Sequence, residues 1–399
     1  MPNRQSKIEK LIVELCPNGV DFFALGELCN PLKKGTLKTG ELSDKGQYPV
    51  INSGRSWYGK YDEYNNDGNA IAIAARGEYA GFINYIDKKF WAGGLCYPYR
   101  SKDEKIAKTK FIFYSLKEKQ EYIRETLVAH GSIPAINKSD VDKFKIPIPP
   151  IAIQEEIVKI LDGFTELEAE LEAELEARKK QYNYYRSELL TFENDATIEW
   201  KKFGDIAKIV RGGSPRPITS FLTTKDNGIN WIKIGDVEKG GKYITQTAQK
   251  IKPEGLAKSR YVKQGDFVLS NSMSFGRPYI LKINGCIHDG WLAIINFSDH
   301  YISDFLYHLL SSDTVYRTMA QKASNGTVQN LNAEIVKSLL LPIPSLAEQK
   351  RIVNILDKFE TLTNDISIGL PAELSARRQQ YEYYRGKLLT FKEKEYANK

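Results

Sequence analysis

Several glycine-containing stretches of this 399-residue chain carry the residue types that recognise DNA bases. Base edges are read by Arg, Lys, Asn, Gln, Ser and Thr side chains that loops present to the DNA grooves. Residues 52–60 read Asn-Ser-Gly-Arg-Ser-Trp-Tyr-Gly-Lys and combine such donors with aromatic rings and flexible glycines. The candidate DNA-binding residues in the first 150 positions are Ser53, Arg55, Tyr58, Lys60, Arg76 and Tyr79. Those farther along the chain are Arg211, Ser214, Arg216, Asn271, Ser272, Ser274, Arg277, Asn325, Thr327 and Gln329. Each of them could instead be a structural turn residue or a surface charge.

Catalytic and metal-binding motifs are missing from the sequence. It contains no Gly-x-x-x-x-Gly-Lys-[Ser/Thr] loop for nucleotide phosphates. The four histidines are not spaced as metal ligands, and Cys286-Ile287-His288 is better explained by packing. The cysteines at positions 16, 29, 96 and 286 form no Cys-x-x-Cys pair, so we expect reduced, partly buried thiols. These features favour binding over catalysis.

An internal repeat sets the architecture that must position the candidate residues. PIPPIAIQEEIVKILDGF followed by ARKKQYNYYRSELLTF spans residues 147–192, and PIPSLAEQKRIVNILDKF followed by ARRQQYEYYRGKLLTF spans residues 342–391. The first parts match at an offset of 195 residues and the second parts at 199. The second copy therefore carries four extra residues, about one helical turn.

Both copies of the repeat predict long helices with a coiled-coil seam. The apolar residues recur at alternating spacings of four and three, which is the pattern of a coiled coil. The insertion in the second copy is a stutter that contains Gly369 and Pro371, so we expect a break there, with Gly ending one helix and Pro starting the next. Because the two seams are nearly identical, we expect the helices to pack on each other. Two unrelated amphipathic core helices are the alternative.

The segments between the helices predict two diverged copies of one globule. Residues 20–28 resemble residues 198–206, and His-Gly-Ser-Ile at 130–133 resembles Asn-Gly-Thr-Val at 325–328, whereas the middles have little in common. Short runs rich in β-branched and aromatic residues alternate with Gly, Asn, Asp and Pro clusters, and short helices follow near 110–126 and 303–322. We expect mixed α+β globules. Because DNA readers should differ between the two copies, the similar turn at 130–132 is better interpreted as a fold-defining turn.

The charge is unevenly distributed along the chain. Residues 1–150 hold 23 basic and 18 acidic side chains, and residues 196–341 hold 19 and 12. Residues 151–195 instead hold 5 basic and 12 acidic ones. Basic globules suit contact with DNA phosphates, whereas the acidic helix is a spacer, a docking face or simply a solvated surface. No apolar run is long enough to cross a membrane, and residues 1–16 lack the apolar core of a signal peptide. We expect a soluble, cytoplasmic protein.

These patterns resemble the specificity subunit of prokaryotic type I restriction–modification systems over essentially the whole chain. The resemblance is carried by QYEYYRGKLLTF, by Gly-Leu-Pro-Ala-Glu at 369–373, by Glu-Leu-Cys-Pro-Asn-Gly-Val at 14–20 and by the order globule, helix, globule, helix. In the second globule, Gly-Ser-Pro at 213–215, Gly-Ile-Asn-Trp-Ile at 228–232 and Ser-Asn-Ser-Met-Ser-Phe-Gly-Arg-Pro at 270–278 are similar to recurrent segments of the family's recognition domains. The first helix departs from the family pattern, since it repeats Glu-Leu-Glu-Ala three times over 166–177 where a Gly-Leu-Pro turn would stand.

The resemblance implies a non-catalytic reader of a bipartite site in double-stranded DNA. Target recognition domain 1, with a short N-terminal helix, would span 1–150, and target recognition domain 2 would span 196–345. Spacer helices at 151–195 and 346–399 would form an antiparallel coiled coil, related by a pseudo-twofold axis. Two modification subunits would dock on this scaffold and methylate adenine with S-adenosylmethionine, and restriction subunits would use ATP and Mg²⁺. This chain itself is expected to bind no cofactor and no metal.

The paired helices offer both a ruler and a docking surface. Thirty-eight helical residues would span about 57 Å, enough to separate two DNA contacts. The expected subunit-docking residues are the aromatic side chains near the helix ends, because amphipathic aromatics often anchor interfaces; these are Tyr182, Tyr184, Tyr185, Tyr381, Tyr383 and Tyr384. Simple packing between the helices is the alternative for these tyrosines.

Two other functions remain open. A single-chain DNA-modifying enzyme is disfavoured, since the Asn-Pro-Pro-[Tyr/Phe] tetrapeptide of the implied adenine methyltransferases is absent and Pro-Ile-Pro-Pro at 147–150 is a rigid connector. A scaffold that does not bind DNA is the other alternative. The target sequence itself depends on loop shape and DNA deformation and cannot be read from these residues.

Overall fold

The computed structural model describes residues 6–192, 195–237, 241–271, 275–323, 331–365 and 367–395. The chain divides into two compact units, of which unit 1 comprises Met1–Glu170 with Leu374–Lys399 and unit 2 comprises Leu171–Glu373. The candidates Ser272, Ser274, Asn325, Thr327 and Gln329 lie outside the described residues. No helix in the described part of the chain is long and apolar enough to span a membrane.

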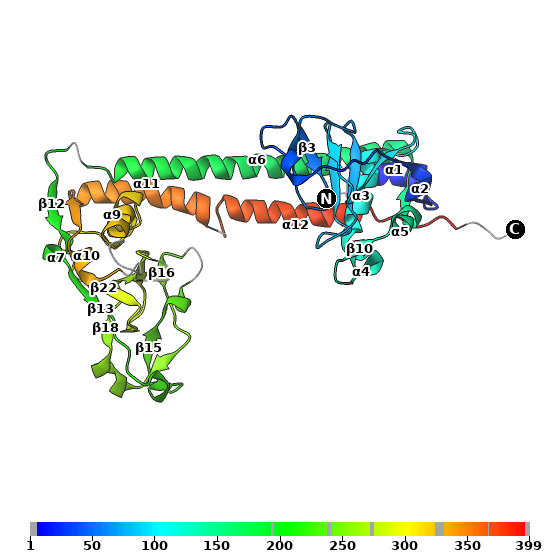
Figure 1. The fold of residues 1–399 in the computed structure, drawn as a ribbon. Helices are drawn as coiled ribbons and strands as arrows, with labels where there is room; N and C mark the ends of the chain where they lie inside the picture. Colours follow the sequence, from blue (N-terminus) through cyan, green and yellow to red (C-terminus); the bar gives the residue numbers. More distant parts are fainter. Residues whose placement is uncertain are drawn as a thin grey trace. The chain divides into compact units, whose positions relative to one another are not determined.

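The globule of unit 1 is built on two sheets. The antiparallel sheet has the order β2 (Cys29–Pro31), β8 (Cys96–Ser101), β5 (Ala70–Ala74) and β6 (Ile83–Ile86). The smaller sheet has the order β4 (Gly59–Tyr61), β3 (Tyr48–Ile51) and β7 (Trp91–Ala92), with β3 and β7 parallel. Helices α3 (Thr109–Glu118) and α4 (Gln120–Leu127) lie near 110–126, where short helices were expected (Figure 1).

Strand β5 shows why this sheet is buried on both faces. Its sequence is Ala-Ile-Ala-Ile-Ala, and successive side chains of a strand point to opposite faces. Ile71 and Ile73 belong to the core that contains α3 and α4, whereas Ala70 and Ala72 belong to a second core with Ile51. The larger side chains therefore meet the helices, and the alanines allow the second sheet to approach closely.

Unit 2 repeats this topology although its sequence has diverged. Its first sheet has the order β13 (Lys208–Arg211), β22 (Trp291–Ile295), β19 (Phe267–Ser270), β20 (Pro278–Leu281) and β16 (Tyr243–Ile244). Its second sheet has the order β14 (Leu222–Thr223), β17 (Lys250–Ile251), β15 (Ile229–Ile232), β21 (Gly285–Ile287) and β18 (Arg260–Val262). The parallel pair β15–β21 corresponds to β3–β7, and α8 (Ser303–Leu310) and α9 (Asp313–Ala323) correspond to α3 and α4. The expected mixed α+β globules are confirmed.

The remaining elements complete the correspondence between the two globules. A two-stranded antiparallel ribbon joins each globule to its helix, formed by β1 (Asp21–Ala24) with β11 (Lys145–Ile148) in unit 1 and by β12 (Glu199–Lys202) with β23 (Leu340–Ile343) in unit 2. The short elements of unit 1 are α1 (Lys7–Leu15), α2 (Leu25–Leu28), β9 (Val128–Ala129), β10 (Ala135–Ile136) and α5 (Lys138–Lys143). Those of unit 2 include α7 (Phe203–Ile206) and α10 (Ala333–Lys337).

The repeated sequences form the predicted long helices. The first copy is one helix, α6 (Ile151–Leu189), and the second is divided into α11 (Leu346–Asn364) and α12 (Leu370–Leu388). The break lies at the predicted stutter, but α11 ends five residues before Gly369, so this glycine belongs to the connection and does not cap the helix directly. A Cβ atom on Gly369 would lie 2.4 Å from the Thr361 carbonyl oxygen, which explains why only glycine is accommodated there.

The seams pack antiparallel within each unit, through the same residue pairs exchanged between the two copies. In unit 1, the ring of Phe164 lies 6.2 Å from that of Tyr381 and 5.6 Å from that of Tyr384 (Figure 1). In unit 2, the ring of Phe359 lies 6.3 Å from that of Tyr182 and 5.6 Å from that of Tyr185. The predicted helix pairing is therefore confirmed.

A buried glutamine connects each globule to its helix. The Gln154 amide donates to the carbonyl oxygens of Ile106 (2.9 Å) and Pro149 (2.8 Å) and accepts from the Lys108 N–H (2.9 Å). Gln349 makes the equivalent three bonds in unit 2, to His300, Pro344 and Ile302. Both side chains are fully buried. Because a buried polar group is stable only when it is hydrogen-bonded, each glutamine fixes how its globule sits on the start of its helix.

Candidate nucleic-acid interface

The loop between β3 and β4 is anchored at its base and exposed at its tip. The Asn52 side chain accepts the Leu95 N–H at 2.8 Å, and the Tyr58 N–H donates to the Val50 carbonyl oxygen at 2.8 Å. Between these two points, Ser53 is half-buried, whereas Arg55 and Tyr58 are exposed. The predicted donor-rich loop therefore presents Arg55 and Tyr58 from a fixed base.

Arg55 and Tyr79, predicted from separate segments, lie together. The Arg55 guanidinium stands 5.1 Å from the centre of the Tyr79 ring and 5.6 Å from that of Phe82. An aromatic face attracts a guanidinium and limits its orientations. The neighbouring Lys117 is partly buried, and burial, followed by the charges of Arg385 and Arg55, lowers its pKa to about 8. Arg55 is thus the most constrained exposed cation of this loop.

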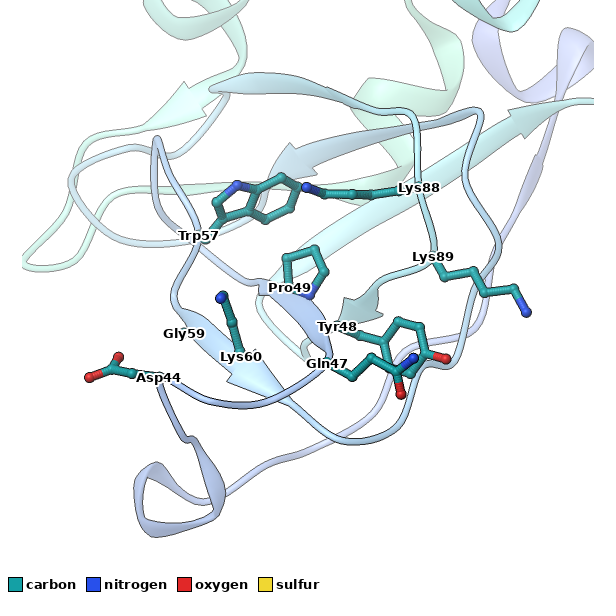
Figure 2. A pocket seen from close by; sticks show the side chains of 9 residues that line it. All are labelled: Asp44, Gln47, Tyr48, Pro49, Trp57, Gly59, Lys60, Lys88 and Lys89. Carbon is teal, nitrogen blue, oxygen red and sulfur yellow. The ribbon is translucent and has the colours of Figure 1, made fainter.

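A pocket beside the same loop collects lysines around an exposed tryptophan. The residues Trp57, Lys60, Lys88 and Lys89 line an open cavity of about 600 Å³. Figure 2 shows these side chains, with Asp44 at the edge. Lys88 lies 5.7 Å from the Trp57 ring, and Lys89 donates to the Tyr64 hydroxyl at 2.9 Å, which raises the Lys89 pKa. Within the described part of the chain, no carboxylate lies at salt-bridge distance from these three lysines. The pocket is therefore positively charged.

Sequence reasoning listed Lys60 as a candidate and included Trp57 in the candidate loop 52–60, but it missed Lys88 and Lys89. Lys88 and Lys89 lie just before β7. They reach the 52–60 loop because β7 pairs in parallel with β3, with Trp91 opposite Val50 and Ala92 opposite Ile51. A parallel pairing between distant short strands leaves no local pattern in a sequence. The adjacent Lys-Lys pair was the available signal.

Arg76 lies on a different turn, beside the segment that contains His130. The Arg76 backbone forms a bridge with Ala135, and the Gly77 N–H donates to the Pro134 carbonyl oxygen at 2.8 Å. Gly77 has φ of +92°, a conformation that favours glycine and makes the turn possible. The Arg76 side chain is exposed, as are the side chains of residues 130–133. The rings of Tyr79 and Phe82, which the Arg55 guanidinium faces, belong to this same turn between β5 and β6.

Four candidates of the second globule converge on a residue that sequence reasoning missed. Asp289 lies in the turn between β21 and β22. Its carboxylate accepts the Ser214 hydroxyl at 2.7 Å and lies 3.5 Å from the Arg216 guanidinium. Its main-chain carbonyl oxygen accepts from Arg211 Nε at 3.1 Å and from Asn271 Nδ2 at 2.9 Å. The hydrogen bond from Ser214, more than the nearby charges of His288 and Arg216, holds the pKa of Asp289 below its usual value.

These four candidates differ in how far they reach solvent. Asn271 is buried and ties its loop to the β21–β22 turn, whereas the Arg216 side chain is 82% exposed. Ser214 is half-buried and Arg211 is exposed. Arg211 and Arg216 are therefore the side chains that this cluster exposes to solvent, and the buried Asn271 has a structural role.

A mostly apolar pocket of about 790 Å³ lies next to this cluster. Its lining includes Pro215, Leu222, Trp231 and His288. His288 accepts the Gly290 N–H at Nδ1 (2.8 Å), and burial lowers its pKa, so the ring is neutral near pH 7. His288 thus adds no charge to the pocket, and the charged residues of its lining are Arg216, Lys233 and Asp289.

Arg277 immediately precedes β20, and its carbonyl oxygen accepts the Ser270 N–H at 3.1 Å. Its guanidinium is exposed and lies 5.5 Å from the centre of the Tyr279 ring. Because it precedes β20 in the way that residues 76–82 precede β6, Arg277 occupies the loop that corresponds to the Arg76 turn of unit 1. The two globules therefore present arginines from equivalent loops with different local sequences.

The tyrosines near the helix ends fall into two groups. Tyr182 is buried against Phe359, and Tyr381 packs on Phe164, so both contribute to the helix pairing. Tyr184 and Tyr383 are 61% and 65% exposed, and each makes an edge-to-face contact with its partly exposed neighbour, Tyr185 or Tyr384. The exposed pairs occupy matching positions of the two repeats and remain the predicted docking residues.

His308 is the one histidine of the described residues that stands in a group of metal-ligand type. Its Nε2 lies 2.8 Å from an Asp357 oxygen, and Glu360 offers a third atom within 4.8 Å. The Lys242 ammonium lies 3.3 Å from the same Asp357 oxygen and 2.6 Å from Asp304. Burial opposes ionisation of Asp357, but His308 and Lys242 hold its pKa below the usual value. A cation is therefore already provided by the protein, and the group connects α8 to α11.

Comparisons with known proteins agree with this arrangement. The family model described as the type I restriction modification DNA specificity domain matches residues 17–177 and again residues 197–376. The chain is 31% identical to the EcoR124I/EcoR124II specificity subunit of Escherichia coli, with 98% of each chain covered. It is also 31% identical to a putative type I restriction enzyme specificity subunit of Haemophilus influenzae, covering 98% of this chain and all of that one.

Solved structures share the fold. The specificity subunit of M. genitalium matches with a TM-score of 0.59 at 20% identity, covering 93% of this chain and 96% of that one. The HsdS subunit of Thermoanaerobacter tengcongensis matches with a TM-score of 0.52 at 16% identity, covering 94% and 96%. The twofold family match, the two globules of one topology and the repeated helices together show that this chain belongs to the specificity subunits of type I restriction–modification systems.

Proposed function

We propose that each globule reads one half of a bipartite DNA site and that the chain performs no catalysis itself. One observation carries this proposal: the strands of both sheets of unit 1 have counterparts in unit 2, which adds β14, β16 and β18, whereas the exposed loops beside β3 and β15 differ in sequence. A shared framework with different loops is the arrangement expected of two readers of different base sequences. The basic charge of both globules supports contact with DNA phosphates.

The paired helices have two roles in this proposal. They set the number of unread base pairs between the half-sites, and their exposed tyrosines bind two modification subunits. S-adenosylmethionine would be bound by the modification subunits, and ATP and Mg²⁺ by the restriction subunits. The complex would act on DNA in the cytoplasm of a prokaryotic cell.

Methylation mapping of the complex with its modification subunits tests the proposal directly. Arg55→Ala or Arg76→Ala should relax recognition in one half-site, and Arg277→Ala should relax it only in the other. An arginine that reads guanine contributes about 1–3 kcal/mol of discrimination. If Arg277→Ala weakens binding to every sequence equally and changes only the salt dependence, Arg277 contacts phosphate.

The two alternative functions give different results in the same system. A purified chain that methylates or cuts DNA alone would show a single-chain enzyme. A chain that causes no DNA mobility shift even with the modification subunits present would show a scaffold without DNA binding.

A further inference from the structure

The carboxylate of Asp289 stands where a carboxylate is electrostatically unfavourable for DNA binding. A negative charge beside Arg211 and Arg216 lowers the local attraction for phosphates, which supplies much of the affinity of any DNA-binding surface. Yet Asp289 is bonded to Ser214 at 2.7 Å and faces Arg216 at 3.5 Å. Its presence is therefore better explained by an effect on the arginine than by an effect on phosphate.

A carboxylate beside a guanidinium restricts how the planar group is oriented. Arginine offers its donors as a rigid fork, and the single ion-pair contact of 3.5 Å from Asp289 biases the direction of that fork. The Arg216 side chain is otherwise 82% exposed, so its rotamers would be ordered only on binding, at a cost in affinity. Asp289 is itself oriented by the Ser214 hydroxyl. Ser214 therefore orients Asp289, and Asp289 in turn orients Arg216.

We propose that Asp289 is a positioning residue that holds Arg216 in the orientation that reads a guanine of the second half-site. Guanine is assigned because its O6 and N7 acceptors match the arginine fork in the major groove. The inference rests on the proposed function, since it requires the second globule to read DNA. It adds a residue that does not touch DNA but decides what Arg216 recognises.

The test is a double-mutant cycle on discrimination, with the full chain assembled with its modification subunits. Arg216→Ala should lower discrimination at one guanine-containing base pair of the second half-site by about 5- to 150-fold. Asp289→Asn keeps an acceptor for Ser214 but turns an amide donor toward the guanidinium, so it should relax the same base pair to a smaller extent. Because Asp289 acts through Arg216, the double variant should match Arg216→Ala alone.

Three further measurements make the cycle decisive. Asp313→Asn is the matched control, because Asp313 also lies 3.5 Å from an arginine, Arg186, and its discrimination should be that of the native chain. Ser214→Ala leaves the carboxylate in place and should produce a partial loss at the same base pair. Thermal melting and recognition of the first half-site should stay unchanged in all of these variants.

Each contrary result has one meaning. Unchanged discrimination in both Asp289→Asn and Ser214→Ala overturns the proposal, as does a loss in the double variant that equals the sum of the single losses. Weaker binding of Asp289→Asn to every sequence alike also overturns it. A native complex that shows no sequence preference refutes the proposed function instead, so the two failures are distinguishable.

Discussion

Arg55 and Arg216 are both arginines on exposed loops, but the protein constrains them by different means. Arg55 lies against the rings of Tyr79 and Phe82, whereas Arg216 faces the carboxylate of Asp289. A pre-oriented guanidinium suits the directional hydrogen bonds of base readout. Within the described residues, no carboxylate lies at salt-bridge distance from Lys60 or Lys88. A flexible ammonium group of this kind suits contact with phosphates, which carry no sequence information.

The pocket lysines of unit 1 should therefore contribute affinity without specificity. In a variant with both Lys88→Ala and Lys89→Ala, binding to all sequences should weaken alike, and the slope of log K against log salt should fall by about 2, or about 0.9 per phosphate contact. Fluorescence titrations of DNA binding at several salt concentrations, from about 50 to about 200 mM, measure this slope. Replacing Lys201 and Lys202, the adjacent pair in β12, provides the control. An unaltered slope would show that the pocket does not contact phosphate.

Lys117 gives the first globule a distinctive pH dependence. Its pKa is lowered from 10.5 to about 8, so between these values the unfolded chain binds more protons than the folded chain. Stability from this site therefore rises as pH increases through that window. The difference in melting temperature, native chain minus Lys117→Met, should increase when the pH is raised from about 7 to about 9.5. Lys119→Met, an exposed lysine nearby, is the control, and a difference that stays flat with pH would contradict the assignment.

The candidate site could be predicted only where its residues lie close in sequence. Arg211, Ser214 and Arg216 were identified because donors, glycines and proline cluster there. Asp289 was missed because it lies 75 positions from Ser214 and because an acidic residue is not an expected DNA contact. The chain fold, rather than any local pattern, brings the two together through the β21–β22 turn.

Among the secondary-structure elements, too, only those specified by a local sequence pattern could be predicted. The heptad spacing predicted α6 and its pairing residues, since helix periodicity is local and the seam residues recur every three or four positions. The sheet order of the globules was beyond prediction, because it depends on pairing between short strands far apart in sequence, such as β3 with β7. The similar ends of the two globules predicted diverged copies of one fold, but their centres share too little sequence to give the strand order.

The Glu-Leu-Glu-Ala units of α6 offer a test of the spacer role. Deleting residues 174–177 removes about 6 Å of helix with only about 40° of rotation, so Leu171 and the seam can be maintained. Both half-site sequences should stay unchanged, while the unread spacer shortens, with one base pair the expected change at about 3.4 Å per base pair. Methylation mapping reads this out.

A shorter deletion supplies the control for the helix experiment. Removing only residues 176–177 turns the remaining helix by about 160° and should disrupt the seam, with a lower melting temperature and loss of methylation. If the four-residue deletion left the spacer unchanged, the helix would not set the distance. Altered half-sites would mean that the globules do not read independently.

At the scale of the whole molecule, the exposed tyrosine pairs at matching repeat positions predict two modification subunits per chain. Mass measurement of the purified complex should show this ratio. Tyr184→Ala and Tyr383→Ala should each weaken one of the two contacts, because each removes a side chain that is more than half exposed and whose ring packs edge-on against its neighbour, Tyr185 or Tyr384.

The matched control for the stoichiometry experiment is Tyr316→Ala, an exposed tyrosine of α9 outside the helix pair. It should leave the ratio at two. A complex with one modification subunit per native chain would rule out the two-copy assembly.

Unit 1 is made from both ends of the sequence, which has a consequence for how the protein is synthesised. Its first 170 residues emerge from the ribosome early, but most of α12 and the backbone pairing of Val20 with Lys392 come from residues after 373. Unit 2, although second in sequence, is complete first. At about 5–20 residues per second, the first globule waits roughly 10–40 s for its last segment while the intervening residues are translated. During that interval the helix surface that α12 later covers is open to solvent, to chaperones and to other nascent chains.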